Sequence, residues 1–182
     1  MGKRQNKTEK RNRRAKMKQY FKPLHTVAPQ NVTVVDGDTV KFSKDGHTFY
    51  VRLIGINAPE LNLDNSQSPQ PFSIEAKERL GQLLLDAKDV KISLHPNLTD
   101  DTQNRLLGHL HVNLKGQYMN VSHVLLSEGL AVPYKIRRGL TKVERMNYDL
   151  LAYEAQRHRI GVHSIPGYVT EDGKFDENKR AV

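Results

Sequence analysis

The order of apolar and polar positions divides the chain into a polar N-terminal stretch and a body with regular periodicity. From residue 31 onward, short runs rich in β-branched residues are separated by polar turns, a pattern that predicts strands. Five strands are expected: Val32–Val35, Thr39–Ser43, Thr48–Ile56, Val90–Leu94 and Leu106–Leu114. Asp45-Gly46 supplies the residues that a tight hairpin requires between the second and third strands, and the interrupted alternation at Gly55 predicts a bulge or bend.

Two later stretches have helical periodicity instead. The first runs from about Ser73 to Ala87, and its apolar residues recur three and four positions apart, which places them on one face. That face consists of Ala76, Leu80, Leu83, Leu84 and Ala87. The second runs from about Met119 to Glu128 and is closed by Gly129, since a glycine just past the last turn adopts the left-handed conformation without strain.

A third helix is predicted to begin at Thr141-x-x-Glu144, a capping box, and to end at Gly161. Its expected buried stripe consists of large apolar residues at helical spacing: Val143, Met146, Leu150 and Tyr153. The stretch from about Pro166 onward is polar and is expected to be loosely held. Five strands and three helices indicate the α+β class with an antiparallel sheet.

The composition excludes several kinds of chemistry. The chain of 182 residues contains no cysteine, so disulfides, thiolate metal sites and a cysteine nucleophile are excluded. No run approaches the roughly 18 consecutive apolar residues of a membrane span. No apolar stretch follows the N-terminal charges as a secretory signal would require. We therefore expect an intracellular protein, cytoplasmic or nuclear, without membrane or disulfide partners. We also expect a monomer.

Net charge is concentrated at the N-terminus. Residues 1–22 hold ten of the 29 lysines and arginines and one of the 20 acidic residues, so the remainder carries 19 of each sign. Such a tail binds polyanions by counterion release, without reading a sequence; a solubilising extension is the alternative. The residues expected to contact nucleic acid are Lys10, Arg11, Arg13, Arg14 and Lys16. We expect a basic, disordered tail over 1–30, a folded domain over 31–165 and a polar extension over 166–182.

Residues suited to phosphate chemistry gather near two strands. Asp36-Gly37-Asp38 follows the first strand, and its carboxylates are oxygen ligands of the kind that Ca²⁺ prefers; a turn motif is the alternative. Arg52 lies inside the third strand, and its planar guanidinium matches phosphate oxygens in a bidentate way. Arg105 follows a polar loop downstream. A surface salt bridge is the alternative explanation for either arginine alone. It is a weaker explanation for two arginines that occur together with the aspartate motif.

These motifs resemble the staphylococcal nuclease (thermonuclease) family. The resemblance covers about Val32 to Ser164 and rests on four segments: Asp36 to Val40, Arg52 to Glu60, Arg105, and Glu128 to Ala131. It implies a five-stranded β-barrel of the oligonucleotide-binding (OB) type with three helices. It also implies a calcium-dependent nuclease that cleaves phosphodiester bonds of DNA or RNA and leaves 3′-phosphate and 5′-hydroxyl ends.

The resemblance also assigns roles to particular residues. Glu60 corresponds to the glutamate that positions or deprotonates the attacking water, and Arg52 and Arg105 correspond to two arginines that stabilise charge at phosphorus. Asp38 corresponds to a direct ligand of Ca²⁺, whereas Asp36 lies behind the ligands without touching the ion. The residues expected to contact substrate are Tyr118, Tyr134 and Lys135, since base stacking needs aromatic faces near the groove.

Several positions depart from the family pattern. Asn57 stands where the family has a second aspartate ligand; a neutral amide can coordinate Ca²⁺ but contributes no charge, so a weaker site is expected. Ala58 replaces the usual threonine, and its backbone carbonyl remains available as a ligand. Thr102 and Gln103 replace the aromatic residue and the lysine often found before the second arginine. A degenerate site would leave a module that binds nucleic acid or a protein partner, which is the alternative to an enzyme.

Overall fold

The computed structural model describes residues 25–27, 31–44, 46–61, 68–99, 105–134 and 139–179. The predicted nucleic-acid tail, Lys10 to Lys16, lies outside these residues, as do Lys135, Thr102 and Gln103. Within the described ranges, no helix is both long and apolar enough to cross a membrane.

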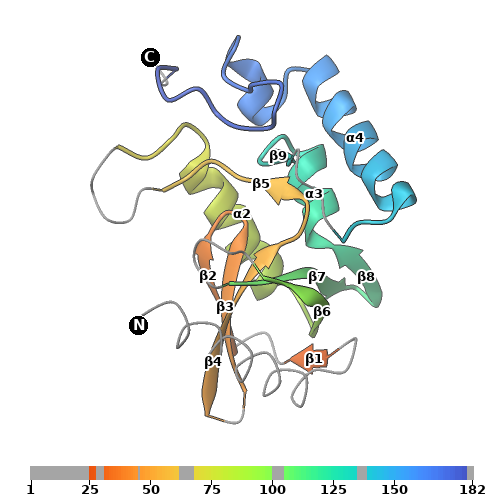
Figure 1. The fold of residues 1–182 in the computed structure, drawn as a ribbon. Coiled ribbons are helices and arrows are strands. Elements are labelled where there is room, and N and C mark those ends of the chain that lie inside the picture. The colour runs from red at the N-terminus through yellow and green to blue at the C-terminus, as the bar shows by residue number, and fades with distance from the viewer. Residues whose placement is uncertain are drawn as a thin grey trace, which may run out of the picture.

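Three consecutive strands form an antiparallel meander that starts the main sheet (Figure 1). They are β2 (Val32–Asp36), β3 (Thr39–Lys44) and β4 (His47–Leu53). The pairing of Lys44 with His47 confirms the predicted hairpin. Alternate residues of β4, namely Phe49, Val51 and Leu53, are buried, as expected for a strand with one face toward the core.

β4 also connects the meander to the second half of the sheet. It pairs in parallel with β7 (Leu106–Leu114), which in turn pairs antiparallel with β6 (Val90–Thr99). β6 extends beyond the predicted end at Leu94 and pairs with β1 (His25–Val27), a strand within the stretch expected to be a tail. The described strands follow the open order β1-β6-β7-β4-β3-β2. This order is consistent with an OB-type sheet, although these strands do not close into a barrel, and it confirms the α+β class.

A second sheet has two strands and lies at the bend predicted after β4. It pairs β5 (Ile56–Asn57) antiparallel with β9 (Val132–Pro133). The chain enters β5 through Gly55, whose φ is +80°. A Cβ at this position would lie 2.3 Å from the Leu140 side chain, so both the backbone conformation and the packing require glycine.

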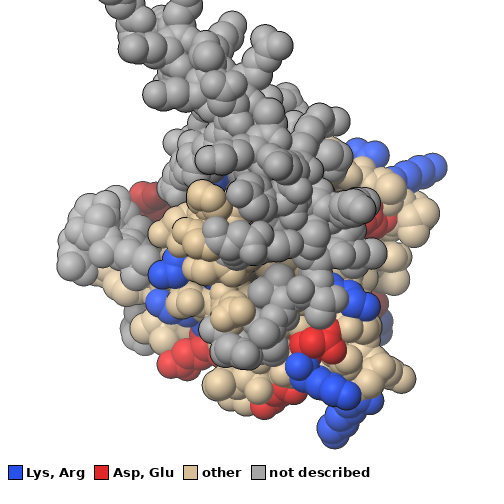
Figure 2. Space-filling model, turned by 90° about the horizontal axis from the view of Figure 1, so that it is seen from below, with Lys and Arg blue, Asp and Glu red and all other residues tan. Residues whose placement is uncertain are grey.

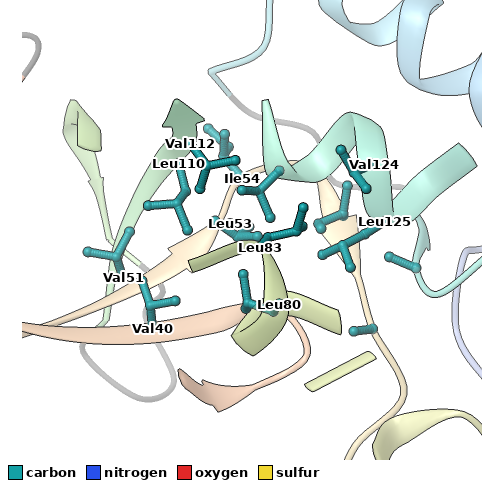
Figure 3. Packing of buried hydrophobic residues seen from close by; sticks show 14 of the residues in the cluster. Val40, Val51, Leu53, Ile54, Leu80, Leu83, Leu110, Val112, Val124 and Leu125 are labelled. Atoms are coloured by element: carbon teal, nitrogen blue, oxygen red, sulfur yellow. The ribbon is translucent and has the colours of Figure 1, made fainter. Parts of the chain in front are cut away.

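Helix α2 (Ser73–Leu85) packs its predicted face into the core (Figure 3). Leu80 and Leu83 point into the same cluster as Val40, Val51 and Leu110 of the sheet, and all five side chains are at most 2% exposed. Burial of each leucine stabilises the fold by about 1.5–3 kcal/mol. The helix is therefore held firmly against the strands that carry the site.

Helix α3 (Val121–Ser127) begins two residues later than predicted. The residues before it, Gln117–Asn120, pair with the end of β7 as β8. Asn120 caps the helix, because its side-chain oxygen accepts a hydrogen bond from the backbone N–H of Ser122 at 2.9 Å. The apolar residue Met119 suggested an earlier start, but cap chemistry decides where the first turn forms.

Helix α4 buries a different face from the one predicted. It spans Lys142–Arg157, and its capping box is present. The residues expected to be buried are 59–65% exposed: Val143, Met146, Leu150 and Tyr153. The inward face instead carries Tyr148, Ala152 and Ala155, and the Tyr148 ring packs on His123 of α3 with 5.5 Å between ring centroids. The predicted stripe is wrong. The face with Ala152 and Ala155 packs inward, because these small side chains let α4 approach its neighbours closely, and the larger side chains face solvent.

The described residues from Pro166 to Lys179 are packed against the domain rather than loosely held. After α4, a short helix η2 (Gly161–Ser164) leads into this segment. Tyr168 and Phe175 are buried with ring centroids 5.0 Å apart, in a second apolar cluster with Val132 and Val162. A bridge joins the two ends of Val169–Phe175, which we call the C-terminal hairpin. Two aromatic residues thus anchor a segment whose overall composition is polar.

On the face of the molecule shown in Figure 2, charge is mixed among the coloured residues. In Figure 2, lysine and arginine side chains are interspersed with aspartate and glutamate, and neither sign forms one continuous patch among the coloured residues. This agrees with the balanced charge of the chain beyond residue 22.

Candidate active site

Three neighbouring strands place the predicted site residues together. On β4, Arg52 pairs with Thr39 of β3 on one side and with Leu107 of β7 on the other. Asp38 immediately precedes β3, and Arg105 immediately precedes β7. The register of the sheet therefore brings Asp38, just before β3, and Arg105, just before β7, close to Arg52 on the strand between them.

Asp38 and Arg52 form what we call the floor of the site. Asp38 is 2% exposed, and its carboxylate accepts hydrogen bonds from Thr39 Oγ1 at 2.9 Å and from the backbone N–H of Ala58 at 3.3 Å. Arg52 Nη2 lies 2.9 Å from Asp38 Oδ2, and the arginine side chain is 16% exposed. Because the pair is largely shielded from water, its attraction is stronger than that of an exposed ion pair.

Arg105 reaches the floor through Thr39. Its Nη1 donates to Thr39 Oγ1 at 3.2 Å, and the same hydroxyl donates to Asp38 Oδ1. Asp38 therefore contacts Arg52 directly and is linked to Arg105 through the Thr39 hydroxyl. This convergence depends on parallel pairing between β4 and β7, which local sequence patterns do not reveal.

Asn57 is linked to two partners at once. Its Oδ1 accepts a hydrogen bond from Arg52 Nη2 at 2.7 Å, and its Nδ2 donates to the carbonyl oxygen of Gly173 at 3.2 Å. The guanidinium thus bridges Asp38 and Asn57, the two side chains that the resemblance assigns as metal ligands. In this structure the amide oxygen expected to coordinate Ca²⁺ faces a cationic side chain.

Glu60 and Asp36 form a second part of the site, which we call the mouth. Burial of its carboxyl group, the negative charges of Asp38 and Asp36, and a hydrogen bond shared with Asp36 raise the pKa of Glu60 to about 7, although the residue as a whole is solvent-exposed. Burial also raises the pKa of Asp36, against the opposing effect of a 2.8 Å hydrogen bond from the Gly37 N–H. Arg52 lowers both pKa values but does not neutralise the pair.

A backbone clamp holds Glu60 in place. Its N–H donates to Gln70 Oε1 at 2.8 Å, and its carbonyl accepts from the Gln70 N–H at 2.9 Å. Pro59 precedes Glu60 and restricts the backbone further. Two hydrogen bonds therefore join Glu60 and Gln70. They restrict the backbone at the residue that is predicted to position or deprotonate the attacking water.

The donor set of the mouth fits a hard cation. Among the described residues, no three His, Asp or Glu side chains are grouped as in a formed metal centre. Burial raises the pKa values of both Asp36 and Glu60, and repulsion from the negative charge of Asp38 raises both further. Carboxylate oxygens are also the ligands that Ca²⁺ prefers. A divalent cation beside them would relieve this repulsion, so charge and donor type agree with the cofactor that the resemblance implies.

The two predicted substrate tyrosines lie in different parts of the molecule. Tyr134 follows β9, and its N–H bonds to the backbone at the entrance to β5, which keeps it close to the site. Tyr118 lies on β8, which pairs with the end of β7 remote from Arg105. Lys91 Nζ sits 3.6 Å from the centroid of the Tyr118 ring, and the Tyr118 hydroxyl donates to Asp89. The structure therefore brings Tyr134, but not Tyr118, toward the other site residues.

Sequence reasoning assigns no role to three residues that the structure places at the site: Thr39, Gln70 and Gly173. Thr39 directly follows the aspartate motif, and a hydroxyl there could have been noted as a relay. Gln70 lies between two prolines that mark an ordered turn. Gly173 is 116 positions from the asparagine that it contacts, and no local signal identifies that contact.

Comparison with known proteins agrees with these observations. A family model described as staphylococcal nuclease homologue matches residues 50–164. The chain is 31% identical over 140 residues to the SPbeta prophage-derived endonuclease YokF of Bacillus subtilis (strain 168), covering 76% of this chain and 45% of that protein. It is also 31% identical over 147 residues to Endonuclease YncB of the same organism, covering 79% and 66% respectively. A micrococcal nuclease of Shigella flexneri is 29% identical over 140 residues, covering 74% and 72%. The chain thus spans between about half and two thirds of the length of the two Bacillus relatives.

Proposed function

This chain belongs to the staphylococcal nuclease homologue family, and on that premise we propose that it is a calcium-dependent nuclease. Its substrates are phosphodiester bonds of DNA or RNA, and its products carry 3′-phosphate and 5′-hydroxyl ends. The observation that carries the proposal is the meeting of Arg52 and Arg105 beside Asp38, next to a glutamate whose pKa is raised to about 7. The relatives named endonuclease and micrococcal nuclease support nuclease activity as the reaction class.

The carboxylates would hold the cofactor. Asp38, with the backbone carbonyl of Ala58, would supply hard oxygen ligands for Ca²⁺, and Asp36 would lie behind them without touching the ion. When bound, the cation acts as a Lewis acid on a phosphoryl oxygen. Its charge would also favour the ionised forms of Asp36 and Glu60, whose pKa values are raised first of all by burial.

Glu60 is the group suited to move a proton. A general base works best when its pKa lies near the working pH, and a pKa of about 7 meets that condition. The Gln70 clamp fixes the backbone of Glu60, so the carboxylate is presented in one region of the site. Glu60 would therefore orient a water molecule and accept its proton.

The two arginines supply positive charge where negative charge develops at phosphorus. Arg52 is fixed by Asp38 and Asn57, and Arg105 by Thr39, so neither has to be ordered during the reaction. Preorganised donors of this kind are worth about 10²–10³ in rate each. Tyr134 lies on the same side and would contact a sugar or base.

A binding module is the second candidate, because the Asn57 amide oxygen is engaged by Arg52 and brings no charge to a metal. The two candidates predict different results for purified protein with labelled single-stranded and duplex substrates. An enzyme cleaves with millimolar Ca²⁺ and stops with chelator, and Glu60→Gln lowers kcat by about 10²–10⁴. The matched control is Glu78→Gln, an exposed glutamate on α2, which should cleave like the wild type.

The end groups provide a second measurement. Fragments with 5′-hydroxyl ends accept a phosphate from polynucleotide kinase without prior treatment, and fragments with 5′-phosphate ends do not. Binding without cleavage at any Ca²⁺ concentration would contradict the enzymatic proposal and support the binding module.

A further inference from the structure

The C-terminal hairpin, Val169–Phe175, lies beyond the residues that the family model matches, yet one of its atoms touches the site. The carbonyl oxygen of Gly173 accepts a hydrogen bond from Asn57 Nδ2 at 3.2 Å. Asn57 in turn holds the guanidinium of Arg52 at 2.7 Å. A continuous chain of hydrogen bonds therefore runs from the hairpin to an arginine of the floor.

The position of Gly173 is tightly determined. Its φ is +72°, and a Cβ added there would lie 2.2 Å from the carbonyl oxygen of Pro133, so the hairpin backbone is seated directly against β9. Within the hairpin, the Thr170 N–H donates to the Lys174 carbonyl at 2.9 Å, and the Gly173 N–H donates to the Thr170 carbonyl at 3.0 Å. A backbone fixed on both sides can hold a neighbouring side chain in one orientation.

Tyr168 anchors the same segment to the start of α2. Its ring is fully buried, and its hydroxyl donates to the carbonyl of Pro71 at 3.0 Å. Pro71 follows Gln70, the residue that clamps Glu60. The C-terminal segment therefore makes two contacts near the site. Gly173 bonds to Asn57, and Tyr168 bonds to the residue that follows Gln70.

The chemistry of the link requires an amide at position 57. A guanidinium only donates hydrogen bonds and a backbone carbonyl only accepts them, whereas a primary amide has one group of each kind. The two partners thus fix which atom of Asn57 faces Arg52. A carboxylate at this position could bind Arg52, but its second oxygen would face the Gly173 carbonyl with no proton between them.

We propose that the C-terminal hairpin is a positioning element of the nuclease site: the Gly173 carbonyl orients the Asn57 amide, and Asn57 orients Arg52. Asn57 is then a positioning residue in the family's carboxylate position, and its role depends on a segment outside the family match. This inference rests on the proposed function, because it concerns the arginine that would stabilise the transition state.

The test compares Gly173→Ala with Gly167→Ala. Both glycines lie in the C-terminal segment with φ near +70°, but the nearest atom to a Cβ at Gly167 is the Lys179 Cε at 3.7 Å. The control therefore imposes similar backbone strain without displacing the hairpin from the site. We expect Gly173→Ala to lower kcat roughly tenfold or more, with KM changed by less than about twofold, because a small misplacement of a catalytic group lowers the rate of the bound complex. Gly167→Ala should retain the kcat of the wild type, and equal kcat values for the two variants would overturn the proposal.

A second pair of variants covers the case in which Gly173→Ala does not fold. Asn57→Ala removes the link without a clash and should lower kcat while leaving KM near its wild-type value. Asn57→Asp should also lower kcat, and calorimetry should find Ca²⁺ affinity no higher than in the wild type. Tighter Ca²⁺ binding together with faster cleavage by Asn57→Asp would instead assign residue 57 as a metal ligand and overturn the proposal.

A spectroscopic measurement separates this inference from the proposed function. The side-chain amide protons of Asn57 should shift in NMR spectra and exchange faster with solvent in Gly173→Ala, and they should stay unchanged in Gly167→Ala. An unchanged Asn57 amide in Gly173→Ala refutes the link even if the protein cleaves nucleic acid. Absence of cleavage by the wild type would refute the proposed function alone, since the amide signals are read without substrate.

Discussion

The floor and the mouth of the site are built from aspartates two positions apart, and their surroundings are opposite in sign. Asp38 in the floor faces Arg52 at 2.9 Å and accepts two further hydrogen bonds. Asp36 in the mouth faces Glu60, and both carboxyl groups have raised pKa values. The more buried carboxylate is the one with a cationic partner, so burial alone does not determine how these groups behave.

This difference separates structural support from reactivity. In the floor, the ion pair with Asp38 and the hydrogen bond to Asn57 fix Arg52 in place. The mouth concentrates like charges that cannot all be ionised without cost, which leaves it ready to take up a proton or a cation. One short motif therefore supplies both a rigid anchor and a reactive pair.

Removing the arginine of the floor should have the largest effect. Arg52→Ala leaves Asp38 buried without its cation, and breaking a buried pair in this way costs about 3–5 kcal/mol in the free energy of unfolding. The control is Arg79→Ala, since Arg79 pairs with Glu128 at 2.6 Å with both side chains about one third exposed. That surface pair should contribute about 1 kcal/mol or less. Urea unfolding of both variants at pH 7 measures the difference. Similar losses would show that the buried Arg52–Asp38 pair contributes no more to stability than an exposed ion pair.

The raised pKa values at the mouth should make the free energy of unfolding depend on pH. The pKa of Glu60 is raised from 4.5 to about 7 in the folded protein, so between these values the folded state binds more protons than the unfolded state. Stability therefore falls as the pH rises through this window and levels off above it. The raised pKa of Asp36 acts in the same direction.

Glu60→Gln removes the titrating group and provides the comparison. In chelator, the wild type should lose stability between pH 5 and pH 8 relative to Glu60→Gln, as measured by urea unfolding at both values. Millimolar Ca²⁺ should reduce this loss, because a cation that binds only the folded state stabilises it by mass action. A wild type that gains stability relative to the variant over the same interval would contradict the repulsion at the mouth.

The smallest effect is expected at the clamp behind Glu60. Gln70→Ala removes the side-chain half of the clamp, an exposed hydrogen bond worth about 0.5–1.5 kcal/mol. A loss of that size in transition-state stabilisation corresponds to about a two- to tenfold fall in kcat. Gln82→Ala removes an exposed bond of the same length to Asp86 at the C-terminal end of α2 and should leave kcat unchanged. Equal kcat values for the two variants would show that the clamp does not position Glu60.

Local patterns predict much of the fold because they report local preferences. Strand alternation, the Asp-Gly turn and the bend at Gly55 correspond to observed elements, and the capping box starts α4 where expected. The apolar face of α2 is confirmed, because Ala76, Leu80, Leu83 and Leu84 are all buried. An arginine inside an apolar strand has to find a partner, and it finds one in the aspartate motif.

What the sequence did not reveal depends on partners remote along the chain. Helix α4 offers two apolar faces, and only the packing of Tyr148 against α3 decides which one is buried. The partner of Asn57 is likewise a backbone carbonyl, which any residue type could supply. The family resemblance implies that Arg105 lies near the site. Its contact with Thr39 could not be predicted without the parallel register of β4 and β7.

The seating of Tyr168 and Phe175 against Val132 bears on where this protein can be shortened. A version truncated after Ser164 would retain all the predicted catalytic positions of the domain. It would expose Val132 and Val162, which those two rings now cover, and leave the Asn57 amide hydrogen without its acceptor. The smallest piece that folds like the whole protein should therefore extend through Asp176, whose N–H bonds to the Tyr168 carbonyl at 2.8 Å.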